Sequence, residues 1–340
     1  MKRDNIIYIP YMIKRDRINE YTSNMIKILE EKYHVKGKLA DSANFLQMLR
    51  TKAVFLNWVE DELDNKMKLQ LFLHKILGVK IIWVFHNKYP HDKEYSDRIV
   101  KNMEWLADHS SIIMLLSRNS KRFIPHITRN VKKAHYIPHI LFDAHNDTKD
   151  DNLVRKNYGI GEDDFLFTIF GAVKPYKNIE EAIAVFKRLN LDHAKMLIVG
   201  KVADNKYAKK IKELCQENED IMLDLQFISN KCLEQIIEAS DVIVMPYKDS
   251  SSMNSAVMIH TFSLGRTVIA PDICMARDFM SEGFIYIYKN SLEKAMKKAY
   301  TNGRTVSRDM GQRAKVHMEQ YHNEAVVRQY ICDMIDNNIK

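Results

Sequence analysis

The stretch VIVMPYKDSSSMNSAVMIHTFSLGRTVIAP, residues 242–271, indicates the fold class of this chain. A short apolar run is followed by a polar loop, an apolar helical segment, a glycine that ends the helix, and another short apolar run. The expected elements are a strand at Val242–Met245, a loop at Tyr247–Ser255, a helix at Ala256–Leu264 and a strand at Thr267–Ala270. This order of strand, loop, helix and strand is the repeating unit of a parallel α/β sheet.

The loop at residues 247–255 favours an anion-binding site. It carries four serines, and Asn254 and Ser255 directly precede the expected helix. Short polar side chains therefore lie beside backbone N–H groups that have no acceptor within the helix. Such a helix start attracts anions, and phosphate most of all. Taken alone, the ordinary explanation of this loop is a helix cap.

A second loop is expected at the same edge of the sheet. The stretch FLFTIFGAVKPYKNIEEAIAVF, residues 165–186, predicts a buried strand, a turn at Gly171 and a helix. Lys174 and Lys177 follow the strand, and Pro175 between them restricts the backbone. Lysines after a strand are most often solvated, but open parallel sheets bind ligands at the carboxyl ends of their strands. Two such loops in one sheet favour a site for an anionic ligand.

Together the two loops resemble the C-terminal, nucleotide-sugar-binding domain of family 4 type glycosyltransferases, most closely the bacterial members that build surface polysaccharides. Residues 171–178 (GAVKPYKN) and 246–271 carry the resemblance. It implies an α/β chain of the GT-B fold, in which two doubly wound Rossmann-like domains face each other across a cleft. It also implies that Lys177 contacts the diphosphate of the donor.

The chain departs from the family pattern within these loops. The second loop of the family reads Glu, seven residues, Glu, and this chain has Ser252 and His260 at those places. Ala172 replaces the usual Arg after the first-loop glycine, and Lys174 can substitute for its charge. Residues 254–256 resemble an Asn-Ser-Gly type loop that some polysaccharide transferases use instead of the acid pair.

The resemblance implies a donor site in the second half of the chain. Lys177 is the expected catalytic cation, neutralising charge that develops on the leaving diphosphate. The nucleobase is expected near Gly200, Ile228 and Ser229. The expected donor-binding residues are Gly171, Lys174, Lys177, Gly200, Ile228, Ser229, Ser252, Met253, Asn254, Ser255 and Ala256.

The first half of the chain carries the expected acceptor site. The strand predicted at Lys80–Phe85 leads directly into His86, and the loop His-Asn with Pro-His close behind resembles the acceptor-domain loop of the family. There a histidine lies over the donor sugar, which makes His86 the second catalytic candidate; a capping or core histidine is the alternative. Asn19 and Tyr21 resemble an Asn-x-Tyr motif on the acceptor side, or simply a capped helix start. The expected acceptor-binding residues are Arg15, Arg17, Asn19, Tyr21, Asn87 and His91.

The charge is divided unevenly between the two expected domains. Residues 1–150 hold 26 Lys and Arg against 18 Asp and Glu, which accounts for the whole net charge of +8. The expected domains are residues 1–150, residues 151–320, and a C-terminal helix at 321–340 that crosses back. The basic half is expected to face an anion, either a membrane surface or a diphosphate-bearing acceptor, although solvated charge without a partner remains an alternative. The basic run at 121–133, interleaved with apolar residues, predicts a helix that either lies on a membrane or packs on its own domain.

Several classes of protein are excluded or disfavoured. No run of 18 apolar residues occurs. The apolar run that follows the first basic residues is too short for a signal peptide. We therefore expect a cytoplasmic protein, with the inner face of the plasma membrane as a further location. The four cysteines are scattered and there is no Asp-x-Asp motif, so we expect no metal and no cofactor beyond the nucleotide sugar as substrate. Nucleic acid is not an expected partner, because no motif for it occurs.

The function predicted is transfer of a sugar from a nucleoside diphosphate to a hydroxyl of a glycan or lipid-linked acceptor in bacterial polysaccharide synthesis. The resemblance implies retention of the anomeric configuration. An inverting route would need a carboxylate base, which Glu20, Glu60 or Asp92 could supply. The alternative from another class is a non-catalytic sugar-nucleotide-binding or scaffold protein. A dinucleotide-dependent oxidoreductase is a weaker alternative, because no Gly-x-Gly-x-x-Gly follows the first strand.

Overall fold

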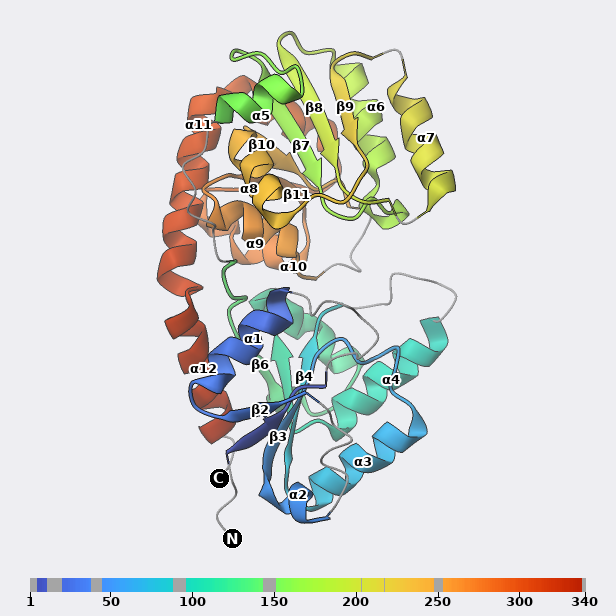
Figure 1. The fold of residues 1–340 in the computed structure, drawn as a ribbon, viewed down its shortest axis with the longest axis vertical. Coiled ribbons are helices and arrows are strands. Elements are labelled where there is room, and N and C mark those ends of the chain that lie inside the picture. The colour runs from blue at the N-terminus through green and yellow to red at the C-terminus, as the bar shows by residue number, and fades with distance from the viewer. Residues whose placement is uncertain are drawn as a thin grey trace. The chain divides into compact units, whose positions relative to one another are not determined.

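The chain folds as two compact units that each carry one parallel sheet. The computed structural model describes residues 5–10, 20–37, 45–87, 96–142, 151–202, 204–216, 218–247 and 253–337. The first unit comprises residues 1–140 with 321–340, and the second comprises residues 141–320. Each unit holds a six-stranded sheet flanked by helices (Figure 1). The predicted α/β class with two Rossmann-like sheets is confirmed.

The first sheet has the order β2-β1-β3-β4-β5-β6, and its described strand pairs are all parallel. The chain runs from β1 to β2, returns to β3 and then continues to β6, so the direction of winding reverses between β1 and β3. The strands are β1 (Ile6–Tyr8), β2 (His34–Lys36), β3 (Thr51–Leu56), β4 (Lys80–Phe85), β5 (Ile112–Leu115) and β6 (Ala134–Tyr136). The helices are α1 (Glu20–Glu30), α2 (Phe45–Arg50), α3 (Asn65–Ile76), α4 (Ser96–His109) and α12 (Glu324–Asn337), with 3-10 helices η3 (Arg118–His126) and η4 (Val131–Lys133).

One face of the first sheet is covered by α1 together with α12, which comes from the far end of the chain (Figure 1). Val327, Ile331 and Ile335 of α12 are fully buried in the same core as Ile28 and Leu29 of α1. Ion pairs fasten the outer side of α12. The pairs are Lys27–Glu324 at 3.0 Å, Lys32–Asp336 at 2.6 Å, Lys52–Asp336 at 2.8 Å and Arg328–Glu31.

The second sheet has the order β12-β11-β10-β7-β8-β9, again with parallel pairs among its described strands. Winding proceeds from β7 to β9, then returns to β10 and continues to β12, so it reverses between β7 and β10. The strands are β7 (Phe165–Phe170), β8 (Ala194–Val199), β9 (Ile221–Asp224), β10 (Val242–Val244), β11 (Val268–Pro271) and β12 (Tyr286–Tyr288). The helices are α5 (Asp151–Asn157), α6 (Ile179–Leu189), α7 (Asn205–Cys215), α8 (Asn230–Ala239), α9 (Ala256–Ser263), α10 (Cys274–Asp278) and α11 (Leu292–Tyr321), with 3-10 helices η5 (Pro175–Lys177) and η6 (Met280–Glu282).

The two stretches at residues 165–186 and 242–271 form the expected elements. Every residue of β7 is buried, as expected for a parallel strand covered on both faces. The strand β10, helix α9 and strand β11 follow in the predicted order, within one residue of the expected bounds. The basic run at 121–133 differs from the expected amphipathic helix. It forms the 3-10 helices η3 and η4, and Ile124 is turned fully into the core.

Candidate functional site

The loop after β7 encloses a lysine. Gly171 has φ +92°, and a Cβ atom built there would lie 2.8 Å from Nζ of Lys177. The missing side chain at Gly171 therefore makes room for the ammonium group. Lys177 is only 4% exposed, and its Nζ donates a hydrogen bond of 2.9 Å to the carbonyl oxygen of Phe170 at the end of β7.

Burial changes the acid–base chemistry of this lysine. It lowers the pKa of Lys177 to about 8, and the charge of the exposed Lys174 contributes in the same direction. A buried ammonium is stabilised by an anion placed against it. The loop therefore holds a cation whose charge is incompletely compensated by the protein.

The start of α9 forms the second part of the site. Ser255 is its N-cap, and its hydroxyl accepts a hydrogen bond of 3.4 Å from the backbone N–H of Met258. Met253 is fully buried, and its carbonyl accepts from the N–H of Met275 at 3.0 Å. These contacts fix residues 253–255 against α10, so the first N–H groups of α9 are held in place. Ser252 lies outside the described residues.

The two loops meet at the point where the sheet reverses its winding. Val257, in the first turn of α9, lies 3.9 Å from a Cβ built at Gly171. Nζ of Lys177 is 6.0 Å from the ring centroid of Tyr247, which follows β10. The carboxyl ends of β7 and β10 are where an open α/β sheet of this order binds ligands. Lys177, Tyr247 and the start of α9 thus lie together at this edge of the sheet and make up one candidate anion site.

The loop after β8 is joined to the loop after β7. Gly200 has φ +136°, and a Cβ built there would lie 2.1 Å from the carbonyl oxygen of Gly171. The N–H of Val173 donates to the carbonyl of Lys201 at 3.0 Å. Gly200 therefore lies directly beside the lysine loop. Ile228 and Ser229 follow β9, two strands from β7, where Ser229 caps α8.

The place of the second family glutamate is apolar in this chain. His260 of α9 is 8% exposed, and its ring lies 5.0 Å from that of Phe142 and 6.2 Å from that of Phe170. An ionised carboxylate between two aromatic rings would be poorly solvated.

The carboxyl edge of the first sheet holds a hydrogen-bonded chain that ends at His86. The amide nitrogen of Asn57 donates to Oγ1 of Thr22 at 2.6 Å, and its amide oxygen is hydrogen-bonded to Nε2 of His86. Because that oxygen can only accept, Nε2 carries the hydrogen. Burial, aided by nearby His139, lowers the pKa of His86 to about 3, so the ring is neutral at pH 7.

An aromatic wall surrounds this histidine. The ring of Trp58 stacks on His86 with centroids 3.8 Å apart and planes 10° apart, and Tyr21 contacts it edge-on at 5.7 Å. Trp58 has φ +56°, an unusual backbone for a tryptophan, and is 38% exposed. Strained residues of this kind cluster at ligand sites. The hydroxyl of Tyr21 is buried without a hydrogen-bond partner among the described residues.

The structure brings the predicted residues His86 and Tyr21 together. It adds three neighbours that the sequence did not indicate, namely Asn57, Thr22 and Trp58. Asn57 and Trp58 fell within an apolar run that resembles a strand up to Val59, whereas β3 ends at Leu56. Asn87 is half-buried next to His86. Four expected acceptor residues lie outside the described part of the chain, namely Arg15, Arg17, Asn19 and His91.

The carboxylates proposed as bases are only partly described. Glu60 accepts a hydrogen bond of 2.9 Å from the indole nitrogen of Trp83, and burial raises the pKa of its carboxyl group. Glu60 is thus hydrogen-bonded to Trp83, whereas His86 is hydrogen-bonded to Asn57. The side chains of Glu20 and Asp92 lie outside the described residues.

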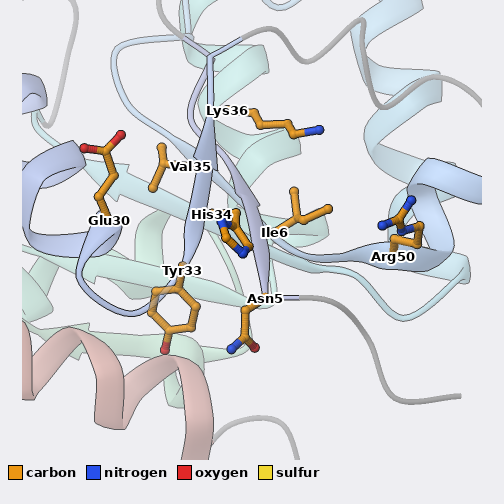
Figure 2. Close-up of a pocket in the computed structure, with 8 residues that line it drawn as sticks. All are labelled: Asn5, Ile6, Glu30, Tyr33, His34, Val35, Lys36 and Arg50. Atoms are coloured by element: carbon orange, nitrogen blue, oxygen red, sulfur yellow. The ribbon is translucent and has the colours of Figure 1, made fainter.

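A separate hollow of 720 Å³ lies beside the edge strand of the first sheet (Figure 2). Asn5 and Ile6, which line this hollow, lie at the amino end of β1. His86 lies at the carboxyl end of β4, so the hollow is at the opposite edge of the sheet from His86. It is lined by Asn5, Ile6, Glu30, Tyr33, His34, Val35, Lys36 and Arg50. None of the residues expected to bind the donor or the acceptor lines it.

Comparison with known proteins identifies the family. Residues 150–317 match the family described as "Glycosyl transferases group 1". The second unit therefore contains a glycosyltransferase group 1 domain, and the fold of the chain is GT-B.

Two curated relatives and several solved structures are similar to the chain. The relatives, from two records of Xanthomonas campestris pv. campestris, are named "GDP-mannose:glycolipid 4-beta-D-mannosyltransferase"; the first is 22% identical over 234 residues, or 68% of this chain. The match spans 60% of that relative's length. Anabaena HepE in complex with UDP has a TM-score of 0.78 at 11% identity, covering 98% of this chain and 100% of HepE. A glycosyltransferase from Rickettsia africae has a TM-score of 0.71 at 14% identity, covering 100% of both chains.

The described residues show neither a membrane-spanning helix nor a metal-binding cluster. None of their helices combines the length and apolar character needed to cross a lipid bilayer. In the same residues, no group of three or more His, Cys, Asp and Glu side chains is placed to hold a metal ion.

Proposed function

We propose that the chain transfers a sugar from a nucleoside diphosphate to a hydroxyl of a glycan or lipid-linked acceptor in bacterial polysaccharide synthesis, without a metal ion. The observation that carries the proposal is the buried ammonium of Lys177 beside the start of α9. A diphosphate is the group that such a cation and a helix start recognise together. The complex of HepE, a protein of the same fold, with UDP is consistent with this ligand class.

The roles of the donor residues follow from their positions. Lys177 would compensate charge that grows on the diphosphate as the sugar leaves, and the first N–H groups of α9 would bind the same oxygens. Lys174, exposed at the start of η5, would add a second positive charge. Gly171 and Gly200 would shape the donor site, because Gly171 leaves room for the ammonium of Lys177 and Gly200 for the backbone of the lysine loop. The loop at Ile228 and Ser229 would contact the nucleobase.

The roles of the acceptor residues follow from the neutral His86. A neutral imidazole can hydrogen-bond a sugar hydroxyl without the repulsion that a cation would exert on a developing oxocarbenium ion. Asn57 holds the ring by a hydrogen bond to Nε2, and Thr22 in turn accepts a hydrogen bond from Asn57. Trp58 offers a half-exposed indole at the same edge, which suits the apolar face of a pyranose ring.

For the stereochemistry we propose retention, with delivery of the acceptor on the face from which the diphosphate leaves. Glu60, the described carboxylate considered as a base, is engaged with Trp83 rather than with His86. The curated relatives are named for a β-linked product from GDP-mannose, which requires inversion of the α-linked donor sugar, so their name favours the inverting alternative. Product stereochemistry by NMR tests the proposal, and an inverted anomer would replace it with a mechanism that needs a carboxylate base.

The acceptor and the location follow from charge and from the relatives. A lipid-linked acceptor accords with the glycolipid named for the relatives and with the basic first half of the chain. Such an acceptor would bring the protein to the inner face of the plasma membrane.

The deciding experiment is thermal stabilisation by UDP, GDP, ADP and CMP and by UDP and GDP sugars. A ligand at 100 times its dissociation constant adds about 2.7 kcal/mol to the free energy of unfolding. One nucleoside diphosphate should stabilise the native chain and have a much smaller effect on Lys177→Met. If none stabilises the chain, the donor site is wrong. If one binds but no sugar is transferred or hydrolysed, the alternative of a non-catalytic nucleotide-binding protein is correct.

A further inference from the structure

Helix α3 exposes more large apolar side chains than is expected of a helix packed on a sheet. Its buried residues are Leu71 and the polar His74. Four large apolar side chains point outward instead. They are Leu69 at 60% exposed, Phe72 at 45%, Leu73 at 41% and Ile76 at 64%.

The exposed side chains form a continuous stripe. Positions 69, 72, 73 and 76 have the spacing i, i+3, i+4 and i+7, which places them on one face of a helix. With about 100° of rotation per residue, Lys66 lies on one side of this stripe, and Lys68 and Lys75 lie on the other. The helix contains no Asp or Glu. We call Leu69, Phe72, Leu73 and Ile76 the α3 stripe.

More exposed apolar residues lie on the same face of the first sheet. The crossings from β2 to β3 and from β3 to β4 run in the same direction along the sheet, so right-handed connections place α2 and α3 on one face. Figure 1 shows α2 and α3 on the face opposite α1 and α12. In α2, Phe45 is 61% exposed and Leu46 is 71% exposed.

We propose that the α3 stripe docks the chain on an anionic lipid surface, with α3 lying in the plane of the interface. Apolar side chains in the middle and lysines on both sides are the arrangement by which a helix inserts between headgroups while its cations meet lipid phosphates. Lys66 is exposed, whereas Nζ of Lys68 lies 5.9 Å from the ring of Trp105 and Nζ of Lys75 donates to the carbonyl of Asp108 at 3.4 Å, so these two would turn from α4 to the lipid. This charge complementarity favours a bilayer, because a second copy of the chain would bring the same lysines together. This inference rests on the proposed function in one respect. A lipid-linked acceptor would lie at such a lipid surface.

The structure also separates this surface from the other basic segment of the unit. In η3, Ile124 is buried, and Lys121 and Arg122 are exposed without a stripe of exposed large apolar side chains. That segment can attract anions but has nothing to insert. The two segments therefore supply matched variants of equal charge change.

The test is sedimentation of the full chain with vesicles of phosphatidylcholine alone and with added phosphatidylglycerol. The native chain should bind the anionic vesicles, and the binding should weaken as salt is raised. Leu69→Glu combined with Ile76→Glu should lower the partition coefficient at least about tenfold. Val316→Glu is the control, because Val316 is also 60% exposed but lies on α11 of the second unit. It should leave binding unchanged.

A second pair of variants separates docking from general electrostatic attraction. Lys66→Glu with Lys68→Glu should weaken binding more than Lys121→Glu with Arg122→Glu. Equal losses from both pairs, equal losses from the stripe and Val316 variants, or no binding to anionic vesicles would each overturn the proposal. So would a concentration-dependent dimer that the stripe variant abolishes. Nucleotide-induced stabilisation is measured without vesicles, so failure of the proposed function is seen separately.

Discussion

Replacing Lys177 by methionine should make the protein more stable while weakening its binding of diphosphate. The pKa of Lys177 is lowered from 10.5 to about 8. At about 1.36 kcal/mol for each pKa unit, holding this lysine in its charged form costs about 3.4 kcal/mol. Methionine removes that cost but leaves the carbonyl of Phe170 without its donor, a loss of about 1 kcal/mol. The net gain should be about 2 kcal/mol at pH 7.

The lowered pKa of Lys177 also determines how the stability difference between the two proteins changes with pH. The folded pKa lies below the ordinary value, so the unfolded chain holds the proton more tightly. The destabilisation is therefore complete below about pH 8 and disappears as the pH rises from 8 towards 10.5. Urea unfolding of Lys177→Met and of the native chain should show a difference that is large at pH 7 and shrinks at higher pH.

The ligand-binding side of the prediction is measured by calorimetry with the nucleoside diphosphate that stabilises the native chain. Loss of a charge-assisted hydrogen bond should weaken binding by about 10-fold to 100-fold. Lys187→Met, an exposed lysine on α6, is the control and should change neither quantity. A destabilised Lys177→Met that binds the diphosphate as tightly as the native chain would show that this lysine is structural, and the reasoning would be refuted.

Three further substitutions test the two edges. Asn57→Asp places a carboxylate against His86 and should raise the pKa of that imidazole from about 3 by at least about two units, followed by histidine NMR; an unchanged pKa would contradict the described hydrogen bond. Tyr21→Phe removes a buried hydroxyl that has no partner among the described residues and should stabilise the chain by about 1 kcal/mol in urea unfolding, whereas a loss would reveal a missing partner. Gly200→Ala should destabilise the chain by more than about 2 kcal/mol, because the new Cβ meets the carbonyl of Gly171; an unchanged melting temperature would show that the loop is free to move.

The central strands of the sheets could be predicted because they are apolar on both faces. β7 is buried at every position, and its sequence indicates a strand without knowledge of its neighbours. The edge strand β2 carries no such signal, because His34 and Lys36 are exposed and the strand has three residues. Pairing with β1, rather than the sequence pattern, makes this segment a strand.

The two candidate sites were only partly predictable. The sequence indicates a lysine after β7, but its burial depends on the space that Gly171 leaves and so on the folded loop. The hydrogen bond between Asn57 and His86 joins residues 29 positions apart in the chain. No local sequence pattern indicates such a contact. A left-handed Trp58 is contrary to local propensity, and tertiary contacts with His86 accompany it.

The covering of α1 by α12 has a consequence for the synthesis of the protein. The 180 residues of the second unit, 141–320, separate α12 from the rest of the first unit. While a ribosome is still translating that interval, the α1 face of the first sheet lacks Val327, Ile331 and Ile335. The second unit, although later in the chain, can therefore complete its core before the first unit does. Nascent chains would expose an apolar face that invites chaperones until α12 emerges.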